Sequence, residues 1–274
     1  MQLRKIVSAV SLAASGSVAI AAHAADGDWS EYTADKMGSR YLPGGKVSAE
    51  TVKSMKVAWR WAMPDNKVWQ DNADLRTHVN ETTPIAVNGV LYTSSPMSFA
   101  SAIDGTTGKT LWTFDPVAYR DGTPPNLGFL NRGLSYWESG EDKRIILGTG
   151  DAYIIALDAK TGKPIESFGN KGRIDMTQGL RRSVERAQMK VQSPPIICNG
   201  MIIPSFNVLD YFAVGRPPGK EPPPGDLRAF DIKTGKEMWN FHQPPQPGEP
   251  GNETWGENSW KTTGAANMWA RPSC

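Results

Sequence analysis

Short apolar runs alternate with turns rich in Gly, Asn and Asp along most of this chain. In residues 84–93 and again in residues 196–203, two such runs are joined by Asn-Gly, at Asn88-Gly89 and Asn199-Gly200. Short runs of β-branched and aromatic residues are typical of strands, and Asn-Gly is the strongest short signal for a hairpin. The pattern therefore predicts antiparallel hairpins over both ranges.

A second regularity is the phrase Ala-x-Asp-x-x-Thr-Gly-Lys, which recurs at residues 102–109, 156–163 and 229–236. Asp and Thr can hydrogen-bond nearby backbone groups and Gly tolerates a positive φ, so each copy predicts a turn between two strands. Two copies continue to a tryptophan, Trp112 and Trp239, whose rings can pack between neighbouring sheets. Such repetition is typical of a β-propeller of four-stranded blades. The alternative is a β-sandwich whose turns resemble one another by chance.

The first residues of the chain have the organisation of a secretory signal. Arg4 and Lys5 precede the apolar residues 6–22, and Ala22-His23-Ala24 is a small-x-small cleavage site. We therefore expect a signal peptide at residues 1–24 and a periplasmic domain at residues 25–274. A transmembrane anchor is the weaker reading, because several serines dilute the apolar run.

Composition narrows the possible functions. The net charge is +2 and the basic residues are scattered, so no nucleic-acid-binding surface is expected. After removal of the signal, no segment has the length of a membrane span. The two cysteines are too few for a disulfide framework, and we expect Cys198 to be a buried, inert thiol.

Several motifs together resemble a known family. They are Glu81-Thr82-Thr83-Pro84, Asn131-Arg132-Gly133-Leu134, Ser193-Pro194-Pro195 and the later run of residues 264–269. In this order they are similar to the quinoprotein dehydrogenases that use pyrroloquinoline quinone (PQQ). The resemblance implies an eight-bladed propeller with PQQ and Ca²⁺ or Mg²⁺ on its axis. This chain resembles the N-terminal half of that propeller, so we expect a fragment with about four to five of the eight blades.

The resemblance also assigns site residues. PQQ is a flat quinone with three carboxylates, so its site needs donors, flat walls and a metal beside the quinone oxygen. The positions that match the family's cofactor contacts are Glu81, Arg132, Gln192, Ser193, Asn207 and Trp269, and the metal ligand is Asp210. The alternatives are a surface arginine at Arg132, a solvated loop residue at Glu81 and a blade-packing ring at Trp269.

The implied function is a periplasmic, PQQ-dependent oxidation of a sugar, polyol or alcohol, with hydride transfer to the quinone. Asn126-Leu127 stands where methanol-oxidising members have two adjacent cysteines, which favours a glucose dehydrogenase-like branch. Electrons would leave to a membrane quinone or a cytochrome. The catalytic base, an aspartate, is expected beyond Cys274, so we expect this chain alone to be inactive.

Two alternatives remain at this point. His78 and His242 could be bases, although loop and packing roles are expected because no partner pattern accompanies them. The whole chain could instead be a non-catalytic propeller that serves as a scaffold for envelope protein assembly. Such scaffolds usually carry a lipid-modified cysteine after the signal, and this chain has none there.

Overall fold

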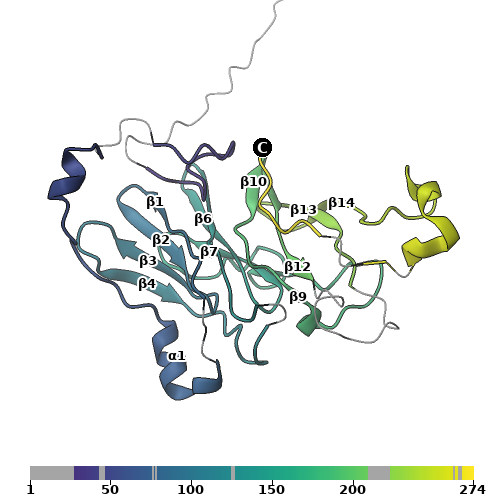
Figure 1. The fold of residues 1–274 in the computed structure, drawn as a ribbon, viewed down its shortest axis with the longest axis horizontal. Coiled ribbons are helices and arrows are strands. Elements are labelled where there is room, and N and C mark those ends of the chain that lie inside the picture. Colours follow the sequence, from purple (N-terminus) through teal and green to yellow (C-terminus); the bar gives the residue numbers. More distant parts are fainter. Residues whose placement is uncertain are drawn as a thin grey trace, which may run out of the picture.

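Three four-stranded antiparallel sheets stand next to one another in the computed structural model (Figure 1). The structure describes residues 28–42, 47–75, 77, 79–124, 127–208, 223–261, 263–264 and 267–274. The expected signal peptide at residues 1–24, and with it Asp210, His78 and Asn126, lies outside the described residues. The predicted all-β class is confirmed, since helices are few and short.

Each sheet follows the chain as a meander. The first contains β1 (Ile85–Val87), β2 (Val90–Ser94), β3 (Ala100–Asp104) and β4 (Thr110–Phe114). The second contains β5 (Ser135–Ser139), β6 (Asp142–Gly148), β7 (Tyr153–Asp158) and β8 (Arg173–Asp175). The third contains β10 (Ile196–Cys198), β11 (Met201–Ile203), β13 (Leu227–Asp231) and β14 (Glu237–Phe241). A two-stranded ladder of β9 (Met189–Lys190) and β12 (Asn207–Val208) brings the number of sheets to four.

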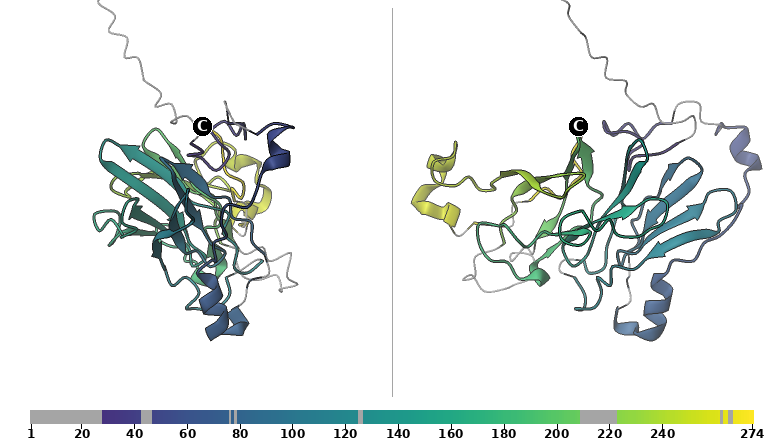
Figure 2. Two further views of the ribbon diagram at one scale, coloured as in Figure 1. Left: turned by 90° about the vertical axis from the view of Figure 1, so that its left-hand side faces the viewer. Right: turned by 180° about the vertical axis from the view of Figure 1, so that it is seen from behind.

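Helical segments lie outside the sheets. They are the 3₁₀-helix η1 (Thr51–Ser54), the α-helix α1 (Asp65–Asp71), and the 3₁₀-helices η2 (Ala73–Leu75), η3 (Arg186–Gln188), η5 (Asn252–Thr254) and η6 (Gly256–Lys261). Figure 2 shows α1 extending below the first sheet and the 252–261 segment projecting beyond the third sheet. No helix among the described residues is long and apolar enough to cross a bilayer.

The three repeated turns have one geometry. The Oδ1 atom of Asp104 accepts hydrogen bonds from the backbone N–H and the hydroxyl of Thr107 at 2.7 and 2.8 Å. The corresponding distances are both 2.7 Å at Asp158 and again at Asp231. The following glycine has a φ of +70 to +72° in all three copies. The sequence prediction of a repeated turn is therefore confirmed atom by atom.

Two of these turns receive a tryptophan from the preceding segment of the chain. Trp112 on β4 donates from Nε1 to the carbonyl of Ala159 at 3.0 Å, and a Cβ on Gly162 would lie 2.5 Å from its ring. Trp59 contacts the first turn in the same way, donating from Nε1 to the carbonyl of Gly105 at 3.1 Å. Residues 57–61 pair with none of the described strands. Trp59 nevertheless docks as Trp112 does.

The second sheet departs from this scheme. Its repeat has Pro164 and Glu166 where a fourth strand with a tryptophan would begin, and proline lacks the N–H needed for a ladder. The fourth strand is instead β8. Arg144 on β6 replaces the missing indole, donating to the carbonyls of Ile232 and Lys233 at 3.1 and 2.9 Å. A guanidinium with several donors thus joins the second sheet to the third.

The apolar core fills the spaces between sheets. Alternate residues of β6 point to opposite faces: Ile145 and Leu147 pack toward the first sheet, and Ile146 packs toward the third. The two clusters bury residues from all three sheets. The middle sheet is therefore covered on both faces, which fixes the angular spread of the blades.

The structure corrects the expectation for cysteine. Cys198 on β10 forms a disulfide with Cys274, 76 positions away in sequence, so it is not a free thiol. Two cysteines are too few for a framework of several disulfides, but they are enough for one disulfide. The sequence could not indicate the pairing, because the fold alone brings residues 267–274 back across the third sheet.

Candidate functional site

The segments that lead into the first strand of each sheet converge. Glu81 precedes β1, Arg132 precedes β5 and Ser193 precedes β10 by three or four positions. Their backbones are bonded in succession: the N–H of Thr83 donates to the carbonyl of Arg132 at 3.0 Å, and the N–H of Arg132 donates to the carbonyl of Gln192 at 2.7 Å. Equivalent positions of three blades thus form one continuous wall.

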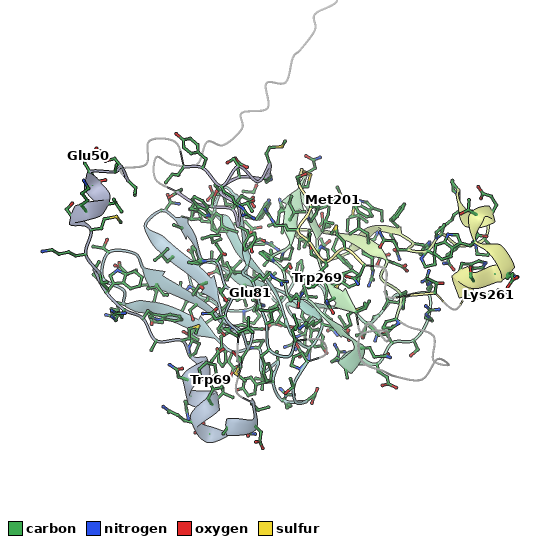
Figure 3. The ribbon with its side chains drawn as sticks, in the orientation of Figure 1. Glu50, Trp69, Glu81, Met201, Lys261 and Trp269 are labelled. Atoms are coloured by element: carbon green, nitrogen blue, oxygen red, sulfur yellow. A yellow bond between two sulfur atoms is a disulfide. The ribbon has the colours of Figure 1, made fainter. Side chains whose placement is uncertain are left out.

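The side chains of these segments meet at Arg132. Its Nε donates to the Oε2 of Glu81 at 2.9 Å, and its Nη1 lies 3.5 Å from the hydroxyl of Ser193. The guanidinium carbon is 5.8 Å from the ring centroid of Trp269. The structure therefore brings together Glu81, Arg132, Ser193 and Trp269, as expected from the resemblance, and Figure 3 places Glu81 and Trp269 near the centre of the molecule.

A cleft of about 400 Å³ opens beside this group. Three arginines line it, Arg40, Arg132 and Arg271, and two of them are paired with glutamates, Arg132 with Glu81 and Arg271 with Glu31. Arg40 has no ion-pair partner among the described residues. The guanidinium groups and the indole of Trp269 give the cleft a positive character and one flat wall, which suits a planar anion.

Gln192 belongs to the same wall through its carbonyl, which accepts from Arg132, but it does not line the cleft. Its side chain is 1% exposed, and neither of its amide atoms has a hydrogen-bond partner among the described residues. A buried amide without a partner is costly, and such groups often await a ligand or a water. The hydroxyl of its neighbour Ser193 donates to the carbonyl of Trp269 at 3.2 Å.

Asn207 stands apart from the Arg132 group. It lies on β12, directly opposite Lys190 of β9, so the two side chains occupy the same face of that ladder. The position of Asp210, expected as the metal ligand, is outside the described residues. Among the described residues, no cluster of three or more His, Cys, Asp or Glu could hold a metal.

Lys190 is a buried basic residue near Arg132 that the sequence analysis did not single out. It is fully buried, it donates from Nζ to the carbonyl of Gly128 at 3.0 Å, and it lies two residues before Gln192 in one extended segment. Burial, with a further contribution from the Arg132 guanidinium, lowers the pKa of Lys190 to about 8. The sequence signal for Lys190 is its position two residues before Gln192, because residues two apart in an extended segment point to the same side.

A larger cleft, of about 680 Å³, lies beyond β14. His242 lines it, and its Nδ1 lies 2.6 Å from the Oε1 of Glu249, an acidic partner that the sequence did not indicate for this histidine. Hydrogen bonding, first from the N–H of Gln246 and then from His242, lowers the pKa of Glu249. Arg132, Ser193 and Trp269 line the smaller, arginine-rich cleft and none of them lines this larger one, so the smaller cleft is the candidate site.

Known proteins share this architecture. The chain is 30% identical over 257 residues to the quinoprotein glucose dehydrogenase of Gluconobacter oxydans, a match that covers 85% of this chain and 30% of the relative. It is also 30% identical over 260 residues to the quinoprotein glucose dehydrogenase of Escherichia coli, covering 90% of this chain and 30% of the relative. The chain therefore spans about 30% of the length of these relatives.

Solved structures agree on the fold. The quinohemoprotein alcohol dehydrogenase ADHIIG of Pseudomonas putida HK5 superposes with a TM-score of 0.60 at 26% identity, over 84% of this chain and 29% of that one. The enzyme of the same type from Comamonas testosteroni gives a TM-score of 0.58 at 25% identity, over 78% of this chain and 27% of that one. Residues 29–274 match the family model described as "PQQ: Glucose/ethanol/alcohol dehydrogenase, beta-propeller domain". The chain thus belongs to the PQQ β-propeller family of quinoprotein dehydrogenases, of which it forms a partial propeller.

Proposed function

We propose that this chain supplies part of the PQQ-binding surface of a dehydrogenase that oxidises a sugar, polyol or alcohol. The observation that carries the proposal is the arginine-lined cleft, where Arg132 is held between Glu81, Ser193 and Trp269. A cofactor with three carboxylates and flat rings requires cations at its edge and an aromatic wall, and these residues supply both.

Individual residues then have distinct tasks. Glu81 engages Nε of Arg132, which leaves the Nη side of the guanidinium to bind a carboxylate or quinone oxygen. The carbonyl of Gln192 accepts from the N–H of Arg132 at 2.7 Å and so fixes the backbone that bears this arginine. Trp269 forms a flat wall, and its half-exposed ring is accessible to a stacking partner. When bound, PQQ supplies the two-electron oxidant that no side chain provides.

Proton transfer needs a base that the described residues do not offer at this cleft. The two carboxylates that contact its arginines, Glu81 and Glu31, are each engaged in an ion pair. We propose that the base belongs to another part of the active enzyme, so that this chain alone, with PQQ and Ca²⁺, oxidises no glucose.

The proposed compartment is the periplasm. The Cys198–Cys274 disulfide supports this, because disulfides persist in oxidising compartments and are rare in the cytosol. The leader-like residues 1–24 point the same way. Detecting the protein in the cytosolic fraction after osmotic shock, with both cysteines reduced, would contradict this location.

A titration tests the cofactor. PQQ is added to the purified protein with and without Ca²⁺, and its absorbance is followed to saturation. Replacing Arg132 by alanine is expected to weaken binding roughly 10- to 100-fold, the size of a lost hydrogen bond to a charged group. Arg120→Ala, an exposed arginine remote from the cleft, serves as the control and should bind normally. Absence of any saturable change with the unaltered protein would overturn the proposal.

A further inference from the structure

One wall of the cleft is a strap of chain, residues 267–274, that belongs to no sheet. Its backbone is fastened to the third sheet region at three successive carbonyls. Met268 accepts from the N–H of Phe206 at 3.2 Å, Trp269 from the hydroxyl of Ser193 at 3.2 Å, and Ala270 from the hydroxyl of Ser205 at 3.0 Å. These bonds set the course of the strap past the cleft.

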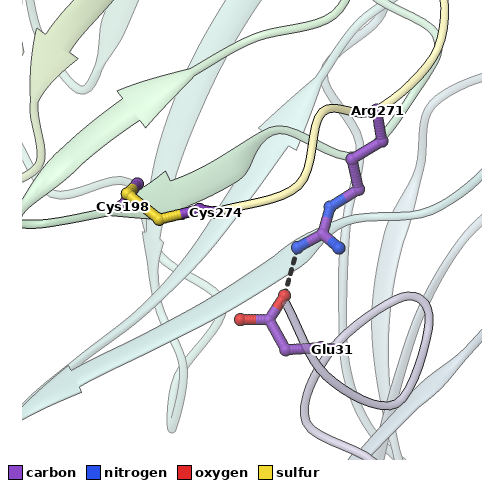
Figure 4. The surroundings of a disulfide bond; sticks show 4 residues. All are labelled: Glu31, Cys198, Arg271 and Cys274. Atoms are coloured by element: carbon purple, nitrogen blue, oxygen red, sulfur yellow. Dashed lines mark hydrogen bonds and ion pairs between the residues drawn. A yellow bond between two sulfur atoms is a disulfide. The ribbon is translucent and has the colours of Figure 1, made fainter. Parts of the chain in front are cut away.

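The far end of the strap has two further fastenings. The guanidinium of Arg271 forms an ion pair with Glu31 in which both side chains are largely buried, and the N–H of Cys274 donates to the carbonyl of Lys36 at 3.3 Å. The Cys198–Cys274 disulfide then joins the strap covalently to β10 (Figure 4). Non-covalent bonds hold both ends of the strap, and this bridge is its one covalent tie beyond the chain itself.

What the strap carries into the cleft is Trp269. The indole is 50% exposed, and its ring faces the Arg132 guanidinium at 5.8 Å. A ring with half its surface in water is weakly fixed by its own packing, so its position follows the backbone that bears it. Arg271, two residues further along, lines the same cleft.

We propose that the Cys198–Cys274 disulfide is a positioning device for the cofactor site, which holds the strap so that Trp269 stays against Arg132. The identity of the ligand in this inference rests on the proposed function. A site that is complete for only part of the time binds with an affinity reduced by that fraction. If loss of the bridge leaves the strap in place about one tenth of the time, the Kd for PQQ rises about tenfold.

The first arm of the test needs no cofactor. Hydrogen exchange is compared in the oxidised protein and after treatment with dithiothreitol at two backbone amides that hold the strap: Phe206, which donates to the carbonyl of Met268, and Cys274, which donates to the carbonyl of Lys36. The S–S bond breaks, each sulfur gains one electron and one proton, and the reagent is oxidised to its cyclic disulfide. The chain has two cysteines, so the reductant has a single target. Exchange of these two strap-holding amides is expected to rise at least tenfold, with the amides of β6 and β7 unchanged.

The second arm measures affinity without a reductant, because thiols react with quinones. The Cys198→Ser/Cys274→Ser protein is titrated with PQQ and Ca²⁺ beside the unaltered protein, after circular dichroism establishes that it is folded. A Kd raised about tenfold is expected. The same double variant is also the control for the first arm, since dithiothreitol should not change its exchange.

The outcomes separate the two proposals. Unchanged strap exchange after complete reduction would overturn the positioning role, whether or not PQQ binds. Faster exchange with an unchanged Kd would overturn the link to the cofactor. If the oxidised protein binds no PQQ, the proposed function fails together with that link, and the exchange arm still decides whether the disulfide orders the strap. If the double variant fails to fold, reduction of the folded protein carries the first arm alone.

Discussion

Trp112 lies on Gly162: the ring of one blade covers the turn of the next so closely that a Cβ on the glycine would be 2.5 Å from the indole. The indole N–H completes the contact by donating to the carbonyl of Ala159 at 3.0 Å. The turn motif and the tryptophan are thus two halves of one interface between sheets. This relationship explains why the repeated phrase pairs a Thr-Gly turn with an aromatic residue.

Gly162→Ala should destabilise the protein more than an ordinary glycine replacement. A φ of +70° costs alanine about 1–2 kcal/mol, and the clash with Trp112 adds a cost of about the same size. Gly140 is the matched control, since its φ is +61° and no atom would meet a Cβ there. Urea unfolding compares the two variants. Equal losses would mean that the indole contact contributes nothing.

Trp112→Phe and Trp239→Phe remove the same N–H from equivalent positions of two sheets. Trp112 loses its bond to Ala159, which should lower the free energy of unfolding by about 1 kcal/mol. The indole nitrogen of Trp239 has no partner among the described residues and its ring is 37% exposed, so its replacement should stay within about 0.5 kcal/mol. Thermal or urea unfolding checks this, and a larger loss for Trp239 would contradict it.

Arg144→Met should weaken the joint between the second and third sheets. The side chain is nearly buried, and its removal leaves the carbonyls of Ile232 and Lys233 without their donor. We expect a loss of about 2–3 kcal/mol by urea unfolding. The adjacent, exposed Lys143→Met should change the free energy of unfolding by less than about 0.5 kcal/mol. Similar effects of both variants would argue against a bridging role for Arg144.

Lys190 makes stability depend on pH in a defined window. Folding lowers the pKa of this ammonium group from 10.5 to about 8, so between these values the unfolded chain binds the proton that the folded protein has released. Stability therefore rises as the pH increases through the window. Lys190→Met lacks this dependence. Between pH 8 and 10.5, the free energy of unfolding of the unaltered protein should rise by on the order of 3 kcal/mol relative to that of the variant. Urea unfolding at both pH values measures this difference. A constant difference would contradict the shift.

The sequence by itself determined the local geometry. Asn88-Gly89 and Asn199-Gly200 form the hairpins expected of them, with positive φ at all four residues. The three Asp-x-x-Thr-Gly turns repeat one hydrogen-bond pattern. Each depends on atoms a few positions apart, so the residues themselves specify the conformation.

Only part of the candidate site could be predicted from the sequence. Glu81, Arg132, Ser193 and Trp269 were expected from family motifs, and the structure places them together. Their meeting follows from the stacking of blades, which no local pattern encodes. Residues 57–61 form no strand, because no described strand pairs with them. Their indoles contact the first sheet instead: Trp59 donates to the carbonyl of Gly105 and Trp61 to the hydroxyl of Thr110.

Tertiary structure alone decided the rest. Cys198 and Cys274 are joined because the strap returns across β10, and Arg144 replaces a missing tryptophan because its guanidinium reaches the next turn. Lys190 is buried on β9, which pairs with β12, a pairing that spacing along the chain does not indicate. A sequence records spacing along the chain, whereas these contacts depend on the angle and separation of packed sheets.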